Sequence, residues 1–174
     1  MKSIVVMATM LEAAEILPYY KPLCEEPFKM FERENQILVI SGMGLDNAKK
    51  CAEFLFANYT FDELLNIGAA GALNENFKFG KFYEVDSFVD ENAKKKASGK
   101  IVLLSCNRAI KSKEEREKFA QIADLVDMEA YAIYSVCAEK SKKFKAVKYV
   151  SDTKESCDIV ENIKRLRKDT IKWI

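Results

Sequence analysis

The sequence predicts a single α/β domain over residues 1–174, with three layers formed by a central, mostly parallel mixed sheet and helices that flank it. Short apolar runs alternate along the chain with longer segments of helical period, which is typical of this class. With 49% hydrophobic residues, a chain of 174 residues can bury a substantial core. Glycine turns follow several of the apolar runs, as expected where strands give way to helices.

Each apolar run is interpreted as a strand and each amphipathic segment as a helix. Strands are expected at residues 3–8, 36–41, 63–67, 81–89, 100–105 and 144–151. Helices are expected at residues 11–20, 46–58, 112–122, 128–139 and 157–174. The second helix has ordinary amphipathic spacing, with Asp46 and Asn47 as candidate caps.

The charge balance bears on the kind of partner. The 28 basic and 27 acidic residues give a formal net charge of +1, without the broad positive field typical of nucleic-acid binders. We therefore expect a small neutral or zwitterionic ligand and no nucleic-acid partner. The first apolar run, residues 4–8, is too short for a signal sequence or a membrane span, so a cytoplasmic protein with no membrane partner is expected.

Histidine is absent from the chain, which excludes Ser-His-Asp triads, histidine-ligated metals and imidazole acid–base chemistry. Proton transfer then depends on carboxylates. The cysteines lack CxxC spacing, which argues for reduced thiols and against a zinc site. They are Cys24, Cys51, Cys106, Cys137 and Cys157. No metal and no cofactor are expected.

Two glycine motifs follow predicted strands, at the sheet edge where open α/β proteins bind ligands. Gly42 and Gly44 precede a helix start, so their N–H groups and the helix dipole are expected to face an oxygen-rich ligand. A Rossmann dinucleotide site is disfavoured, because Asn47 occupies the third position of the glycine pattern. The loop expected at residues 68–73 has small side chains that allow close approach to a ligand, although packing explains them equally well.

Four carboxylates are candidates for the chemistry. Glu129 follows Met128 at a predicted helix start, where it can accept two hydrogen bonds from a vicinal diol or simply be a first-turn acid. Asp152 directly follows a predicted strand. A ligand that covers its carboxyl group would partly desolvate it and make it a usable acid. The alternative is a structural role, since aspartate is also common in turns. Glu12 and Glu15 compete for the task of activating water.

These motifs resemble the purine nucleoside phosphorylase and 5′-methylthioadenosine/S-adenosylhomocysteine nucleosidase superfamily, which includes futalosine hydrolases. The resemblance rests on residues 8–13, 41–48, 68–73, 126–133 and 151–152. The segment between Leu73 and Val126 is shorter than is usual in that family. Ala69 stands where the family often has serine or threonine, and Ala109 where it commonly presents an aromatic residue to the base.

The resemblance implies cleavage of an N-glycosidic bond through an oxocarbenium-like transition state. In that scheme Asp152 protonates or hydrogen-bonds N7 of a purine, Glu129 binds ribose hydroxyls, and Glu12 activates water. The implied substrate-binding residues are Met128, Glu129, Met43, Gly44, Ala70 and Gly71. The resemblance also implies a homodimer or another homo-oligomer.

Water is favoured over phosphate as the nucleophile, because no cation lies near Gly42 and Gly44 in sequence and Asp46 would oppose a phosphate dianion. The resulting hypothesis is a nucleosidase that acts on a purine nucleoside or a 5′-modified relative. A shortened homologue that binds a nucleoside or a partner without turnover is an alternative, and a phosphate-dependent phosphorylase is another. A flavodoxin-like module is disfavoured, because no Ser/Thr-rich phosphate loop follows the first strand.

Overall fold

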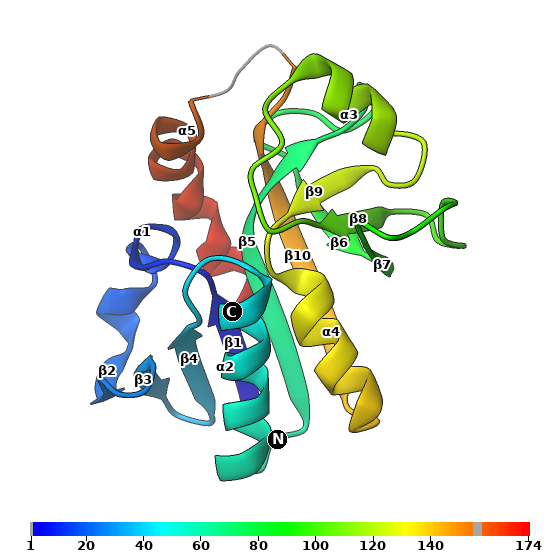
Figure 1. The fold of residues 1–174 in the computed structure, drawn as a ribbon. Coiled ribbons are helices and arrows are strands. Elements are labelled where there is room, and N and C mark those ends of the chain that lie inside the picture. Colours follow the sequence, from blue (N-terminus) through cyan, green and yellow to red (C-terminus); the bar gives the residue numbers. More distant parts are fainter. Residues whose placement is uncertain (1, 155–157) are drawn as a thin grey trace.

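The computed structural model describes residues 2–154 and 158–174, and within them ten strands form one mixed sheet with helices on both faces (Figure 1). The strands are β1 (Ser3–Met7), β2 (Lys21–Cys24), β3 (Lys29–Arg33), β4 (Gln36–Ile40), β5 (Glu63–Ala72), β6 (Phe82–Val85), β7 (Ser87–Asp90), β8 (Val102–Ser105), β9 (Leu125–Asp127) and β10 (Lys143–Asp152). The helices are α1 (Met10–Ala13), α2 (Leu45–Asn58), α3 (Lys113–Phe119), α4 (Ala130–Glu139) and α5 (Ile159–Leu166), with 3-10 helices η1 (Leu17–Tyr19) and η2 (Arg167–Trp173).

Strand β5 is the centre of the sheet. Its first half pairs in parallel with β1, and almost its whole length pairs in parallel with β10. Its last two residues, Gly71 and Ala72, pair with β9 in the antiparallel sense. The main strand order is β2-β3-β4-β1-β5-β9-β8-β7, and β10 connects β5 to β6. The sheet is therefore mixed, as predicted.

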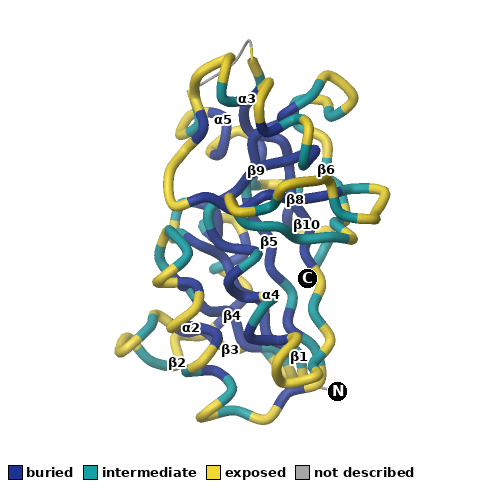
Figure 2. Tube along the Cα trace, turned by 45° about the vertical axis from the view of Figure 1, so that its right-hand side comes forward, coloured by how far each residue is buried: buried dark blue, intermediate teal, exposed yellow. Residues whose placement is uncertain are grey.

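Side chains of β1 alternate between the two faces, as the period of a strand requires. Ile4 and Val6 pack with α2 and α4 in one hydrophobic cluster. Val5 and Met7 pack on the other face, with residues of α1 and the C-terminal end of the chain. Figure 2 shows the buried residues following the central strands, with exposed residues on the outer turns. The predicted three-layer class is confirmed.

The N-terminal third differs from the prediction. The helix expected at residues 11–20 is one turn of α-helix, α1, followed by η1. Pro18 lies at the start of η1, where its missing N–H is tolerated; inside a longer helix it would break the hydrogen-bond pattern. The hairpin β2–β3 was not predicted, because β2 is mostly exposed and lacks the apolar alternation of a core strand.

The glycine-rich segment after residue 67 is also corrected. It is not a loop but the second half of β5, which runs to Ala72 between β10 and β9. The strand expected at residues 81–89 is divided into β6 and β7 at Asp86, whose carboxylate accepts a hydrogen bond from the N–H of Ile101 at 2.7 Å. Strand β9 was not predicted, since three residues carry no periodic pattern.

Helix boundaries close to the site also differ. The N-cap of α2 is Gly44, with a φ of 95°, and neither Asp46 nor Asn47 caps the helix; Asn47 donates instead to the carbonyl of Met43. The C-terminal helix expected from Cys157 begins, as far as the structure describes it, at Ile159; Cys157 itself lies outside the described residues. The other four cysteines are free. No helix among the described residues combines the length and apolarity needed to span a bilayer.

Candidate active site

A cavity of about 330 Å³ lies at the carboxyl ends of β1, β5, β9 and β10. This size is at the lower end of the range for small-molecule sites, about 300–1,000 Å³. Glu12, Glu129 and Asp152, which are far apart in sequence, all line this cavity. Met43, Ala70, Gly71 and Met128 line it as well.

Glu12 is positioned by the first turn of α1. It forms a capping box with Thr9: its Oε2 accepts hydrogen bonds from the N–H and the Oγ1 of Thr9, both at 3.0 Å. Its Oε1 accepts from the N–H of Ala69 at 2.9 Å. Burial raises the pKa of Glu12 above its usual value, while these hydrogen bonds and Lys148 act in the opposite direction. Glu15, its competitor, is exposed and pairs with Arg167 at 3.1 Å.

Glu129 is the N-cap residue of α4, and its side chain turns toward the start of α2. Its Oε1 accepts a hydrogen bond from the N–H of Gly44 at 2.8 Å, joining two motifs that are 85 residues apart. Burial raises its pKa to about 7; Asp127 adds to the rise, and Lys148 opposes it. The carboxyl group of Glu129 therefore changes its charge near neutral pH.

The two glycine N–H groups expected to face a ligand are occupied by acceptors of the protein. Gly42 donates to the carbonyl of Ala8 at 3.1 Å, and Gly44 donates to Glu129. This corrects the expectation that they cradle a ligand oxygen. The turn instead orients a carboxylate that lines the cavity, and Gly44 belongs to the site through that contact.

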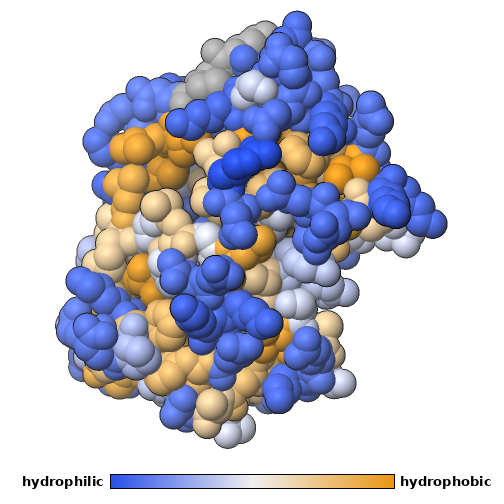
Figure 3. Space-filling view, viewed as in Figure 1, coloured by the Kyte–Doolittle hydropathy of each residue, from blue (hydrophilic) through white to orange (hydrophobic). Residues whose placement is uncertain are grey.

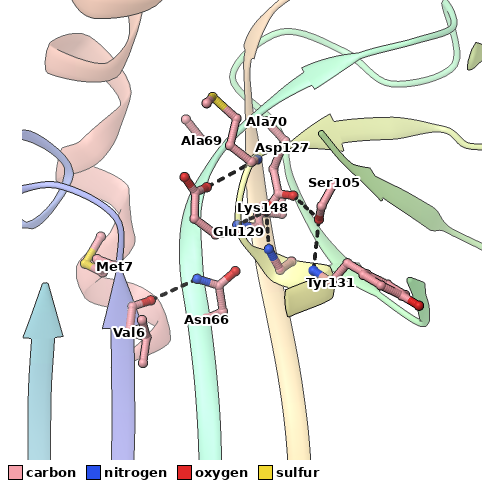
Figure 4. A network of polar contacts seen from close by, with 12 residues as sticks. Val6, Met7, Asn66, Ala69, Ala70, Ser105, Asp127, Glu129, Tyr131 and Lys148 are labelled. Carbon is pink, nitrogen blue, oxygen red and sulfur yellow. Dashed lines mark hydrogen bonds and ion pairs between the residues drawn. The ribbon is translucent and has the colours of Figure 1, made fainter. Parts of the chain in front are cut away.

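A buried ion pair borders the cavity, and Asp127, one of its members, lines it. The Nζ of Lys148 lies 2.8 Å from Asp127 Oδ2, and both side chains are almost fully buried (Figure 4). Asp127 also accepts hydrogen bonds from the N–H of Ala130 and the hydroxyl of Ser105. Sequence reasoning missed Lys148, although a lysine inside the apolar run of residues 144–151 is itself a signal for a buried acidic partner.

Asp152 is the last residue of β10, not the first residue after it. Its Oδ1 accepts a hydrogen bond from the hydroxyl of Ser151 at 2.8 Å, and its Oδ2 is paired with the guanidinium of Arg116 from α3. Arg116 was also missed. The only hint in the sequence is that it lies three residues before Phe119, on one face of an otherwise charged helix.

The rim of the cavity is apolar. Met43 and Val160 line it and are 63% and 53% exposed. Figure 3 shows hydrophobic side chains gathered over α5, which carries Val160. Ala109 also lines the cavity, between Arg108 and Ile110. Among the residues that the structure describes, no group of three or more histidine, cysteine or carboxylate side chains is arranged to hold a metal ion.

The fold and the site together define an α/β protein with four carboxylates, Glu12, Asp127, Glu129 and Asp152, around a small cavity at the strand ends. A family model described as "Phosphorylase superfamily" matches residues 6–110, which is more than half of the chain. The chain belongs to this superfamily, and the resemblance noted in the sequence is confirmed. No curated protein sequence matches it significantly.

Solved structures of similar fold include a 5′-methylthioadenosine/S-adenosylhomocysteine nucleosidase from Helicobacter pylori, with a TM-score of 0.84 and 15% identity over 99% of this chain and 96% of that one. Futalosine hydrolase from the same organism has a TM-score of 0.85 and 14% identity over 99% and 95% of the chains. A nucleosidase from Colwellia psychrerythraea, solved in complex with adenine, has a TM-score of 0.81 and 17% identity over 97% and 89%. At these identities the likeness establishes the shared fold.

Proposed function

We propose that this protein is a nucleosidase that hydrolyses the N-ribosidic bond of a purine nucleoside or a 5′-modified purine nucleoside. The observation that carries the proposal is the convergence of Glu12, Glu129 and Asp152 on one cavity of about 330 Å³. Carboxylates suit both tasks of N-glycoside cleavage, which are activation of a nucleophile and protonation of a leaving group. The similar folds of known nucleosidases support the same reaction class.

In this scheme the bond between C1′ and the purine breaks, and its electron pair leaves with the base. Asp152 transfers a proton to N7, so the base departs neutral. Glu12 takes a proton from water, whose oxygen forms the new bond to C1′, so the products are the free sugar and the free base. The Glu129 carboxylate accepts hydrogen bonds from the ribose hydroxyls, and Met128 packs against the sugar.

Water is the proposed nucleophile because the charges around the sugar end are predominantly negative. Glu12, Asp127 and Glu129 surround the single ammonium of Lys148, which is already paired with Asp127. A phosphate dianion would meet repulsion here and would find no uncommitted cation among these groups. A water molecule carries no such penalty.

The remaining binding roles follow from the lining of the cavity. Ala70 and Gly71 present little side-chain bulk, which leaves room for a flat base near Asp152. Met43 and Val160 form an apolar rim that suits an apolar 5′ substituent. We also propose a cytoplasmic homodimer, which the free thiols and the exposed apolar rim support; light scattering after gel filtration measures the assembly.

The test is incubation of the protein with a panel of purine nucleosides, with and without phosphate, followed by chromatographic detection of free base. Release of base without phosphate is the expected result. Strict dependence on phosphate would replace hydrolysis by phosphorolysis. Binding of nucleosides without release of base in either condition would favour a homologue that does not turn over.

A further inference from the structure

Arg116 is the one arginine among the largest fully buried side chains of the described residues. It projects from α3, where its neighbours Glu114, Glu117 and Lys118 are exposed, and only 1% of its own surface is accessible. A guanidinium loses much of its hydration free energy on such burial, so a fully buried arginine requires a specific compensating partner.

The compensating partners lie at the ends of two central strands. Arg116 Nη1 donates to the carbonyl of Ala72 at 2.8 Å, at the end of β5. Arg116 Nη2 is paired with Asp152 Oδ2, at the end of β10. The planar guanidinium bridges these two points in a fixed geometry that a lysine ammonium does not reproduce. The orientation of the Asp152 carboxylate is therefore defined from outside the cavity.

Gly71 provides the space for this pair. A Cβ at this position would lie 2.6 Å from Asp152 Oδ2 and 3.1 Å from Arg116 Nη1. Arg116 itself does not line the cavity, whereas Asp152 does. The Nε of Arg116 is buried and has no hydrogen-bond partner in the described part of the chain, so the guanidinium is not ideally accommodated for stability alone.

We propose that Arg116 is a positioning residue for Asp152: it directs the carboxyl group toward the base and supplies the countercharge that remains once the proton has moved to N7. This inference rests on the proposed nucleosidase function. When the bond to C1′ breaks, the electron pair goes to the purine, the proton goes from Asp152 to N7, and the new carboxylate is left beside the guanidinium. Arg116 acts through Asp152 and does not touch the substrate.

The test compares two leaving groups. Cleavage of a purine nucleoside requires protonation of the departing base. Cleavage of p-nitrophenyl riboside releases a stable anion and requires no such protonation. With Arg116→Met, we expect kcat for the nucleoside to fall by about 10²-fold or more, with little change in KM, because general acid catalysis contributes about 10²–10⁴-fold. Cleavage of p-nitrophenyl riboside should be nearly unaffected. Equal losses on both substrates, or no loss on either, would overturn the proposal.

Two variants serve as controls. Lys113→Met on the same helix removes an exposed cation and should leave both activities unchanged. Arg116→Lys keeps the positive charge but lacks the planar guanidinium that can donate to two acceptors at once. It should retain intermediate activity on the nucleoside. If Arg116→Met does not fold, the double variant Arg116→Met/Asp152→Asn is compared with Asp152→Asn alone. No further loss is expected in the double variant, and an additional loss would contradict action through Asp152.

A wild-type protein that cleaves neither substrate would refute the proposed function, and calorimetry with adenine then decides the role of Arg116. Weaker adenine binding by Arg116→Met, with binding retained by Arg116→Lys, would support positioning without catalysis. Equal adenine binding by wild type and Arg116→Met, or no adenine binding by either, would overturn the positioning role of Arg116. If the wild type cleaves the nucleoside and Arg116→Met cleaves it at the same rate, the proposed nucleosidase function is supported and the positioning role of Arg116 is overturned.

Discussion

Lys148 of β10 and Asp127 at the end of β9 form an ion pair of 2.8 Å in which both side chains are almost completely buried. The same ammonium also lies close enough to Glu12 and Glu129 to stabilise their charged forms. A lone ammonium thus compensates a carboxylate in the core and influences two carboxyl groups that line the cavity. Stability and chemistry are coupled through this one side chain.

The first prediction concerns this pair. Lys148→Met leaves the Asp127 carboxylate buried without its cation, and we expect the free energy of unfolding to fall by about 3–5 kcal/mol, as is typical when one member of a buried pair is removed. Urea denaturation measures the loss. Adding Asp127→Asn should recover part of it, because the unpaired charge is then gone. Lys145→Met, on the same strand but half-exposed, is the matched control and should change stability by about 1 kcal/mol or less.

The second prediction separates Glu12 from its neighbour. Glu12→Gln should lower turnover of nucleosides by about 10²–10⁴-fold, since an amide cannot take a proton from water. Because burial already opposes the charge on Glu12, the substitution should not lower the melting temperature at neutral pH. Glu15→Gln, which changes an exposed carboxylate, should remain active. Similar activity of the two variants would remove Glu12 from the mechanism.

The third prediction concerns the pH dependence of activity. A diol is bound best by an ionised carboxylate, and the pKa of Glu129 is raised to about 7. We expect kcat/KM to fall as pH decreases below this value, because Glu129 then loses its charge, and the raised pKa of Glu12 should make the fall steeper. Initial rates between about pH 5 and 9 provide the measurement. A flat profile over that range is incompatible with a role for ionised Glu129.

The same pKa shift predicts the pH dependence of stability. The pKa of Glu129 rises from 4.5 to about 7 on folding, so the folded state binds more protons than the unfolded chain between these values. Its contribution to stability is therefore complete below about 4.5 and is lost as pH rises through about 7. Glu129→Gln should lack this dependence, and the difference in unfolding free energy between variant and wild type should change across that range. A constant difference would contradict the shift.

The fifth prediction uses the close packing around Gly68. A Cβ here would lie 2.8 Å from Glu12 Oε1 and 3.6 Å from Lys148 Nζ, both of which are ends of flexible side chains. Gly68→Ala should therefore displace the Glu12 carboxylate while the fold is retained, and a displacement of about 1 Å can lower turnover by about 10²-fold. Circular dichroism and turnover distinguish the two effects. Gly99→Ala, which meets Ser87 away from the cavity, is the control and should remain active.

The fold class was predictable because β1 and β4 are continuous apolar runs, which is the sequence pattern of strands buried on both faces, and because β10 carries a longer apolar run interrupted by lysines. The predicted boundaries of strands and helices were wrong where tertiary contacts outweighed the local sequence pattern. Residues 68–72 are too small to carry a strand signal, and they are strand because β9 and β10 pair with them on either side. Pro18 explains in local terms why the first predicted helix is so short.

The sequence by itself determined the class of fold, the superfamily and the carboxylates that are candidates for the chemistry, because these depend on local pattern and motif order. Only the tertiary structure decided that Glu12 and not Glu15 lines the cavity and that Gly44 donates a hydrogen bond to Glu129. It also decided that Lys148 pairs with Asp127 and Arg116 with Asp152. The physical reason is that the electrostatics of a buried carboxylate depend on neighbours in space, and those neighbours come from strands and helices distant along the chain.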